Sequence, residues 1–244
     1  MGRSQAGASA AVMKNVHECR ATQVRTALNF VRASRIMKKS LLVFTVTALL
    51  VAGCHVYLDE PIASSVAAAL HTVGTGQASL EIPDLLLPLV VAVTVLGWAG
   101  RFLFAGNAAY RNLQRCSALL GVVAPASYLA KEVFKFVFGR IQTPAWLLQP
   151  TSTGFHWFQG VEPYNGFPSG HMLVIAALAA VLWRSYPKFT ALYAAGLVIL
   201  AVSLVLTDYH FVGDVIAGAY GGLLVYELMT TPIMLKLFRI AAKV

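Results

Sequence analysis

The sequence predicts an all-α, polytopic membrane protein with six transmembrane helices. Composition is the first reason: 58% of the 244 residues are hydrophobic and 12% are charged, whereas soluble domains are about half apolar and about a quarter charged. The second reason is distribution, because the apolar residues gather into separate runs, and a run of about 20 crosses a bilayer as a helix. The third is that basic residues cluster at alternate ends of these runs, which indicates a fixed orientation in a membrane.

Residues 1–39 are predicted to be a basic cytoplasmic N-terminal tail, and residues 40–244 a single membrane domain. The tail carries eight of the 19 Lys and Arg residues, which would be attracted to the negative surface of the inner leaflet. The net charge of +9 therefore reports membrane topology, and no nucleic-acid partner is expected.

The first span is predicted at Leu41–Leu58. A competing interpretation is a lipoprotein signal that starts at Met37 and ends at a lipidated Cys54, but the 36 residues before Met37 argue against it. Residues 59–84 hold four acids and no Lys or Arg, which indicates an outer loop. Within this loop Ile62–Val73 is too short to span and is expected to form an interfacial helix.

Five further spans complete the domain. They are predicted at Leu85–Phe104, Ser117–Phe138, Met172–Trp183, Phe189–Leu206 and Gly213–Met234. The run that begins at Met172 is short for a full crossing, so the turn before it is expected to dip below the outer surface and leave a recessed site. With both termini inside, 16 of the 19 basic residues lie at inner ends, and the three outer cations are Lys131, Lys135 and Arg140.

Three polar motifs fall on the outer side of this topology. One is Gly166–His171, a tight turn that opens a helix, where free backbone amides and the positive end of the helix dipole can hold an anion. Another is His210 followed by Asp214, a spacing that puts the carboxylate one helical turn from the imidazole. The third is the group of outer cations. Cations, a helix N-terminus and two histidines together suit phosphoryl transfer, so an outer-face active site is predicted.

These motifs resemble the type 2 phosphatidic acid phosphatase superfamily over about residues 131–222. The family pattern is a Lys, six residues and Arg-Pro, later Pro-Ser-Gly-His, and later Ser-Arg, five residues, His, three residues and Asp. This chain has Pro168-Ser169-Gly170-His171, then His210 and Asp214. The resemblance implies that His210 is the nucleophile that becomes phosphohistidine, that Asp214 orients it, and that His171 is the general acid for the leaving group. It also implies that phosphate oxygens are held by Lys135, Arg140, Ser169 and Gly170.

Two arginines of the family pattern are absent. Counting from Lys135 puts the Arg-Pro pair on Gln142 and Thr143, and the Ser-Arg pair falls on Ser203 and Leu204. Loss of a guanidinium weakens charge stabilisation in the transition state. Three functions therefore stay open: hydrolysis of a lipid phosphate, its transfer to an acceptor other than water, and a non-catalytic role on the same scaffold.

The leading interpretation is a metal-independent lipid phosphatase that hydrolyses a phosphate ester or anhydride of a lipid at the outer leaflet. Its partners are a phosphorylated lipid substrate and membrane lipids, and its expected location is the bacterial inner membrane, with the site facing the periplasm or exterior. No cofactor is expected, because no histidine and carboxylate cluster has metal-ligand spacing. Either Lys131 or Lys135 would contact phosphate. His55 and His156 are expected at the surface, and Asp208 is expected to cap a helix.

Overall fold

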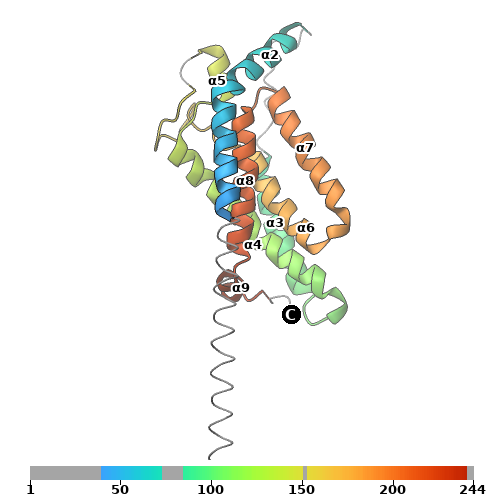
Figure 1. The fold of residues 1–244 in the computed structure, drawn as a ribbon. Coiled ribbons are helices and arrows are strands. Elements are labelled where there is room, and N and C mark those ends of the chain that lie inside the picture. The colour runs from blue at the N-terminus through green and yellow to red at the C-terminus, as the bar shows by residue number, and fades with distance from the viewer. Residues whose placement is uncertain (1–39, 73–84, 151–152, 241–244) are drawn as a thin grey trace, which may run out of the picture. The chain divides into compact units, whose positions relative to one another are not determined.

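The computed structural model describes residues 40–72, 85–150 and 153–240 (Figure 1). The chain divides into two compact units, Met1–Val46 and Thr47–Val244. In the first unit the described residues, 40–46, begin the helix Ser40–Tyr57, and the predicted basic tail lies outside the described residues. The second unit holds the rest of that helix, every labelled element and the whole candidate site.

The prediction of an all-helical membrane protein is confirmed. Within the described ranges the backbone forms helices and turns, with one isolated antiparallel bridge between Arg140 and Phe155. Five helices among the described residues are long and apolar enough to cross a membrane, and Gly170–Ser185 is apolar but shorter. The five are Ser40–Tyr57, Leu86–Leu103, Ala108–Phe138, Pro187–Leu206 and Val212–Met229.

The labelled helices follow one another along the chain in the order of their numbers (Figure 1). Short 3-10 turns, Ala108–Tyr110 and Pro187–Phe189, lead into two of the long helices. In chain order the α-helices are α2 (Asp59–Thr72), α3 (Leu86–Leu103), α4 (Arg111–Phe138), α5 (Thr143–Leu148), α6 (Gly170–Ser185), α7 (Thr190–Leu206), α8 (Val212–Met229) and α9 (Pro232–Leu237).

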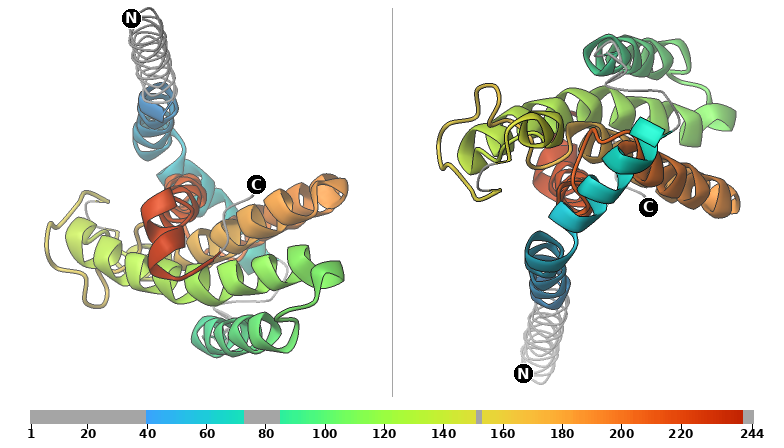
Figure 2. Two further views of the ribbon diagram at one scale, coloured as in Figure 1. Left: turned by 90° about the horizontal axis from the view of Figure 1, so that it is seen from below. Right: turned by 90° about the horizontal axis from the view of Figure 1, so that it is seen from above.

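The longest helix, α4, is the centre of the bundle. It packs against α3 on one side and against α6 and α8 on the other (Figure 2). The contact with α3 is close because two glycines face each other: a Cβ added to Gly97 would lie 2.6 Å from the backbone nitrogen of Gly121. Small residues allow this approach of two backbones, which is how helices gain packing contacts inside a membrane. Two clusters of buried apolar side chains fill the remaining space around α4.

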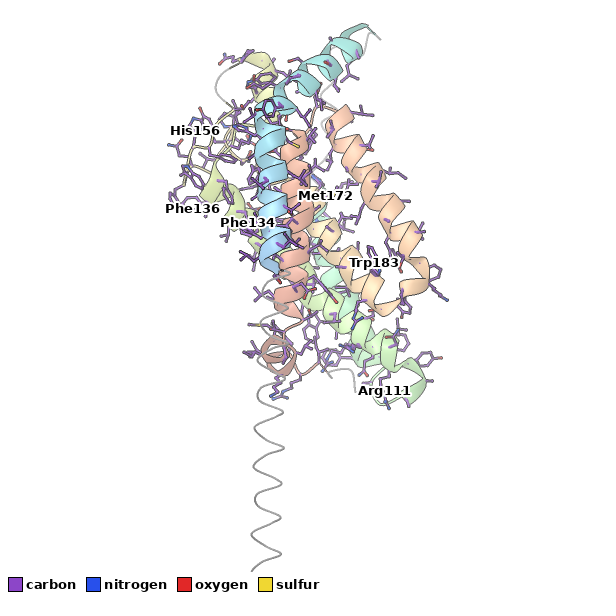
Figure 3. All side chains as sticks on the ribbon, in the orientation of Figure 1. Arg111, Phe134, Phe136, His156, Met172 and Trp183 are labelled. Carbon is purple, nitrogen blue, oxygen red and sulfur yellow. The ribbon has the colours of Figure 1, made fainter. Side chains whose placement is uncertain are left out.

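Helices α6 and α8 pack against each other, which brings the two histidine motifs together. Gly218 of α8 lies against the start of α6, because a Cβ at this position would come within 2.5 Å of the carbonyl oxygen of Ser169. Figure 3 shows His156 at one end of the bundle and Arg111 at the other, with Met172 between them at the start of α6. The turn before α6, residues 166–169, is buried.

Two helix ends differ from the prediction by more than three residues. Helix α4 begins at Arg111, before the predicted Ser117, because the polar residues that precede the apolar run also fit a helix. Helix α8 ends at Met229, before the predicted Met234. The cause is a new helix start: the side chain of Thr231 accepts a hydrogen bond from the backbone nitrogen of Met234, with proline at the first position of α9.

Candidate active site

The site is built around His210 and Asp214, at the connection between α7 and α8. His210 Nδ1 lies 3.7 Å from Asp214 Oδ2, which is a distance of ionic attraction and longer than a hydrogen bond. Both side chains are buried, with exposed fractions of 6% for His210 and 0% for Asp214. The structure therefore brings together the imidazole and the carboxylate that the sequence pairs.

The start of α8 holds Asp214 in a fixed orientation. Phe211 has an extended backbone and precedes the first helical residue. Asp214 Oδ2 accepts a hydrogen bond from the Phe211 backbone nitrogen at 3.2 Å, and its Oδ1 accepts one from Arg140 Nη1 at 2.6 Å. A carboxylate in the first turn also interacts favourably with the helix dipole. Asp214 has a bonded partner on each oxygen, and Oδ2 is the oxygen that faces His210.

Burial and nearby charges act in opposite directions on His210. Burial is the largest effect and lowers the pKa of His210, because a charged imidazole loses its hydration. The charge of Asp214 opposes this shift, that of Lys135 reinforces it, and the backbone of Gly166 opposes it. The net direction is downward, so the ring of His210 is neutral at neutral pH, while Asp214 stabilises the positive charge that the ring gains when it reacts.

The start of α6 is joined to the start of α8. Ser169 is the N-cap of α6, and its hydroxyl accepts a hydrogen bond from the backbone nitrogen of Met172 at 3.4 Å. The backbone nitrogen of Ser169 donates to the carbonyl oxygen of Asp214 at 3.0 Å. Because this bond links the two helix starts, a displacement of one reaches the other.

The two histidines flank a single tyrosine. The ring of His171 makes an edge contact with Tyr209, with 5.5 Å between centroids. Tyr209 makes a second edge contact with His210, at 5.1 Å. His171 therefore lies beside His210 with one aromatic ring between them.

Lys131 and Lys135 lie one turn apart on α4 and differ in their surroundings. Lys131 is buried, pairs with Glu132 at 2.9 Å and lies over the ring of Tyr128 at 4.0 Å. Its carbon chain packs against Gly170, where a Cβ would come within 2.5 Å of it. The charge of Lys135 instead acts on His210. Of the two lysines that the sequence left open, Lys135 is the one whose charge reaches the imidazole.

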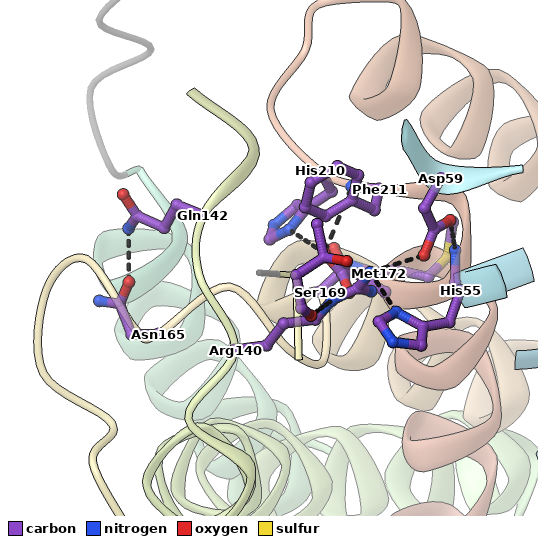
Figure 4. Close-up of polar contacts among 12 residues, drawn as sticks. His55, Asp59, Arg140, Gln142, Asn165, Ser169, Met172, His210 and Phe211 are labelled. Atoms are coloured by element: carbon purple, nitrogen blue, oxygen red, sulfur yellow. Dashed lines mark hydrogen bonds and ion pairs between the residues drawn. The ribbon is translucent and has the colours of Figure 1, made fainter. Parts of the chain in front are cut away.

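Arg140 is fully buried and occupied by protein partners (Figure 4). Nε donates to the carbonyl oxygen of Thr153 at 3.1 Å, Nη1 donates to Asp214, and Nη2 donates to Asp59 Oδ2 at 2.7 Å. Nη2 also lies 3.0 Å from His55 Nδ1. These partners differ from the phosphate oxygens that the resemblance implies for Arg140. They leave few N–H groups of the guanidinium for a substrate.

The chain reaches this position through Gly139, the C-cap of α4. Its φ of 54° lies in the left-handed region that favours glycine. A Cβ at this position would also collide with the carbonyl group of His156. Both constraints require glycine at the point where the chain leaves α4 and turns Arg140 inward.

Asp59 and His55 are the site residues that the sequence did not indicate. They lie 81 and 85 positions before Arg140, so no local spacing connects them to it. The expectation that His55 is a surface residue is wrong, because its ring contacts the buried guanidinium. The available signal is the group of four acids without a basic residue in residues 59–84, which by charge alone indicates only an outer loop.

The two positions where the family arginines would fall have local partners instead. Gln142 Nε2 donates to Asn165 Oδ1. Leu204 is buried, and its carbonyl oxygen accepts from the backbone nitrogens of Tyr209 and His210, both at 3.1 Å. In the described part of the chain, no three His, Cys, Asp or Glu side chains are grouped so that they would hold a metal ion.

Comparison with known proteins places these features in a family context. Residues 116–235 match the model of the PAP2 superfamily. Over 66 residues the chain is 33% identical to the lipid A 1-phosphatase of Rhizobium etli, a stretch that covers 27% of this chain and 28% of that protein. Among solved structures, a transmembrane PAP2-type phosphatidylglycerolphosphate phosphatase from Bacillus subtilis is similar, with 25% identity and a TM-score of 0.43, over 77% of this chain and 92% of that chain.

Proposed function

We propose, on the premise that this chain belongs to the PAP2 superfamily, that it hydrolyses a phosphate ester or anhydride of a membrane lipid through a phosphohistidine intermediate. One arrangement carries the proposal: His210 lies 3.7 Å from the buried carboxylate of Asp214, and His171 lies beyond Tyr209. A nucleophilic imidazole, a carboxylate that stabilises its cation and a second imidazole are the groups that a two-step transfer uses.

In the first step a neutral ring nitrogen of His210 attacks the phosphorus atom. A phosphorus–nitrogen bond forms, the bond from phosphorus to the leaving oxygen breaks, and His171 donates a proton to that oxygen. The lowered pKa of His210 favours this step, because it keeps the attacking ring neutral. Asp214 then stabilises the positive charge of the phosphorylated ring.

In the second step a water molecule attacks the phosphohistidine. His171 accepts the proton of this water, the phosphorus–nitrogen bond breaks, and His210 returns to its neutral form as inorganic phosphate leaves. The same residue thus acts as acid and then as base.

The phosphate is held by the charge of Lys135, by the hydroxyl of Ser169 and by the backbone nitrogen of Gly170. These two residues open α6, whose first N–H groups point along the helix axis without partners inside the helix. The proposal gives no phosphate contact to Arg140, since its guanidinium is buried among protein partners. It requires no metal ion, because Lys135 and the helix start supply the positive potential.

The proposed topology has six spans, with α6 as the short fourth span and residues 40–244 as the membrane domain. Support comes from the five long apolar helices and from α6. Both termini would lie in the cytoplasm, with the tail 1–39 on the inner leaflet and the site at the outer face of a bacterial inner membrane. Because α6 is short for a full crossing, its N-terminal end would lie below the outer surface and recess the site, within reach of a lipid headgroup.

The experiment uses full-length protein in non-ionic detergent with phosphatidic acid or lipid A as substrate, in the presence of EDTA. Inorganic phosphate is the expected product, and an added alcohol acceptor distinguishes transfer from hydrolysis. His210→Ala is expected to abolish turnover and any trapped phosphoenzyme. His171→Ala is expected to slow turnover but to retain some phosphoenzyme from para-nitrophenyl phosphate, whose leaving group needs little protonation.

Three results would contradict the proposal in different ways. Labelled phosphate that remains on the His210→Ala protein but is absent from the His171→Ala protein would show that the two histidines have exchanged roles. Activity that disappears in EDTA and returns only with a divalent ion would contradict the metal-independent mechanism. If thermal melting shows that the protein is folded but it yields neither free nor transferred phosphate, the result would favour the non-catalytic role.

A further inference from the structure

Arg140 connects the proposed catalytic carboxylate to a second acid that lies outside the family match. One side of the guanidinium bonds to Asp214 at 2.6 Å and the other to Asp59 at 2.7 Å. All three side chains are buried, with exposed fractions of at most 1%. Asp59 is the first residue of α2, whereas the PAP2 match begins at residue 116. The site is thus completed by a segment that lies outside the matched residues.

Asp59 also binds the start of α8 directly. Its Oδ1 accepts a hydrogen bond from the backbone nitrogen of Gly213 at 2.9 Å, while its Oδ2 is bonded to Arg140. Gly213 lies next to Asp214, and a Cβ added to it would come within 3.0 Å of Asp59 Oδ2. Asp59 therefore contacts both supports of Asp214: the helix turn that carries it and the guanidinium that bonds to it.

The charges in this cluster depend on one another. Burial alone would lower the pKa of Arg140, but Asp214 and Asp59 together raise it above its usual value, so the guanidinium stays charged. One cation is shared between two carboxylates, which leaves Asp214 with part of its negative charge for His210. With Asp59 neutral, Arg140 would interact with Asp214 alone and reduce the attraction between Asp214 and the imidazolium.

We propose that Asp59 is a positioning residue that acts through Arg140 and Gly213 to set the orientation and charge of Asp214. The inference rests on the proposed function, in which Asp214 supports the nucleophile His210. It also assigns Arg140 a structural connection, in place of the phosphate contact that the sequence resemblance implies.

The kinetic experiment compares Asp59→Asn and Arg140→Gln with the wild-type full-length protein, with phosphatidic acid as substrate. Both variants are expected to lose about 10- to 100-fold in kcat with little change in KM. The reason is that they change the position or the electrostatic surroundings of the Asp214 carboxylate and leave the phosphate contacts in place. Glu227→Gln is the matched control, since it removes an exposed acid from the other end of α8, and it is expected to keep wild-type rates.

The pH dependence of kcat/KM separates positioning from a merely structural role. The groups that face His210 are Asp214, Lys135 and the Gly166 backbone, with His171 beyond Tyr209. Asp59→Asn removes negative charge, so the acid limb should move to lower pH. Arg140→Gln leaves Asp214 without its cation, so the acid limb should move to higher pH. Wild-type kcat and an unmoved acid limb in Asp59→Asn would overturn the proposal.

A double-mutant cycle of melting temperatures tests the ion-pair network even if the protein shows no turnover. Melting temperatures in detergent are measured for the wild type, each single variant and the Asp59→Asn/Arg140→Gln double variant. The double variant should lose less in melting temperature than the two single losses added together, because Arg140→Gln leaves Asp59 buried without a cation and Asp59→Asn removes that unpaired charge. Additive losses would overturn the network. If the wild type released no phosphate but the cycle showed coupling, the proposed function would fail while the ion-pair network stood.

Discussion

At the scale of single residues, Asp208 has no part in the proposed reaction and yet lies two positions before its nucleophile. It is not the cap of a helix, as the sequence suggested, because Phe211 precedes α8 and Thr207 follows α7. Its side chain is buried, and Oδ1 has no hydrogen-bond partner in the described part of the chain. Its φ of 53° is left-handed, a conformation that Asp and Asn adopt more readily than most residues.

Replacing Asp208 by Asn should stabilise the protein at neutral pH and have little effect at acidic pH. Burial raises the pKa of Asp208 from 3.8 to about 6, so the folded state prefers the protonated acid. This preference stabilises the fold fully below the unfolded pKa and is lost as pH rises through about 6. Asparagine keeps the shape and the left-handed backbone but has no charge.

The measurement is the melting temperature of Asp208→Asn minus that of the wild type, across pH 4 to 8. The difference is expected to be small at the acidic end, to increase through about pH 6 and then to level off. A difference that is constant over this range would show that the carboxylate of Asp208 is not buried in its charged form. Phosphate release by the variant serves to check that the neighbouring site is intact.

At the scale of helices, the close contact between α3 and α4 depends on Gly97. A Cβ at this position would come within 2.6 Å of the Gly121 backbone, and backbone atoms cannot move aside as a flexible side chain would. Gly97→Ala is therefore expected to separate the two helices and to lower the melting temperature, since overpacking costs about 1–3 kcal/mol.

Gly196→Ala is the control for this prediction. Gly196 also lies inside a long apolar helix, α7, but no described residue outside the neighbouring backbone of that helix lies within 4 Å of a Cβ placed there. Because alanine is the better helix former, this variant should melt at or above the wild-type temperature. Equal losses from the two variants would show that the helix-to-helix contact is not the cause.

Sequence patterns predicted the long helices because each is a continuous apolar run with few charges. Helix α3, at Leu86–Leu103, lies within one residue of its predicted limits at each end, and α7 ends at the predicted Leu206. The short α5 was missed, since its six residues, Thr143–Leu148, are too few to show a helical period. The first turns of α4 were not predicted because the residues there are polar and lie outside the apolar run.

At the scale of the whole molecule, orientation in the membrane is a prediction that rests on charge. In a background without native cysteines, Glu162→Cys should react with an impermeant thiol reagent added outside intact cells, and Lys188→Cys should be protected. Both side chains are exposed, so access alone would not distinguish them. The opposite labelling pattern would place the site at the inner face.

The candidate site was predictable where the motif is local and unpredictable where it is not. His210 and Asp214 are four positions apart, and Ser169 to His171 are consecutive, so helical geometry alone places them. The partners of Arg140 lie 74 positions after it and 81 before it, and only the packed bundle brings them together. The sequence therefore predicts that the Arg140 cation lies near the site, but the partner it predicts for this cation is the substrate phosphate.

The buried bond between Arg140 and Asp59 has a consequence for how such a sequence can evolve. A lineage that loses the arginine leaves an acid buried without its cation, and a lineage that loses the acid leaves a cation shared by one carboxylate fewer. Either first change is a handicap that the other relieves. Positions 59 and 140 are thus expected to be inherited as a pair, so an acid at the first should accompany an arginine at the second across descendants of a common ancestor.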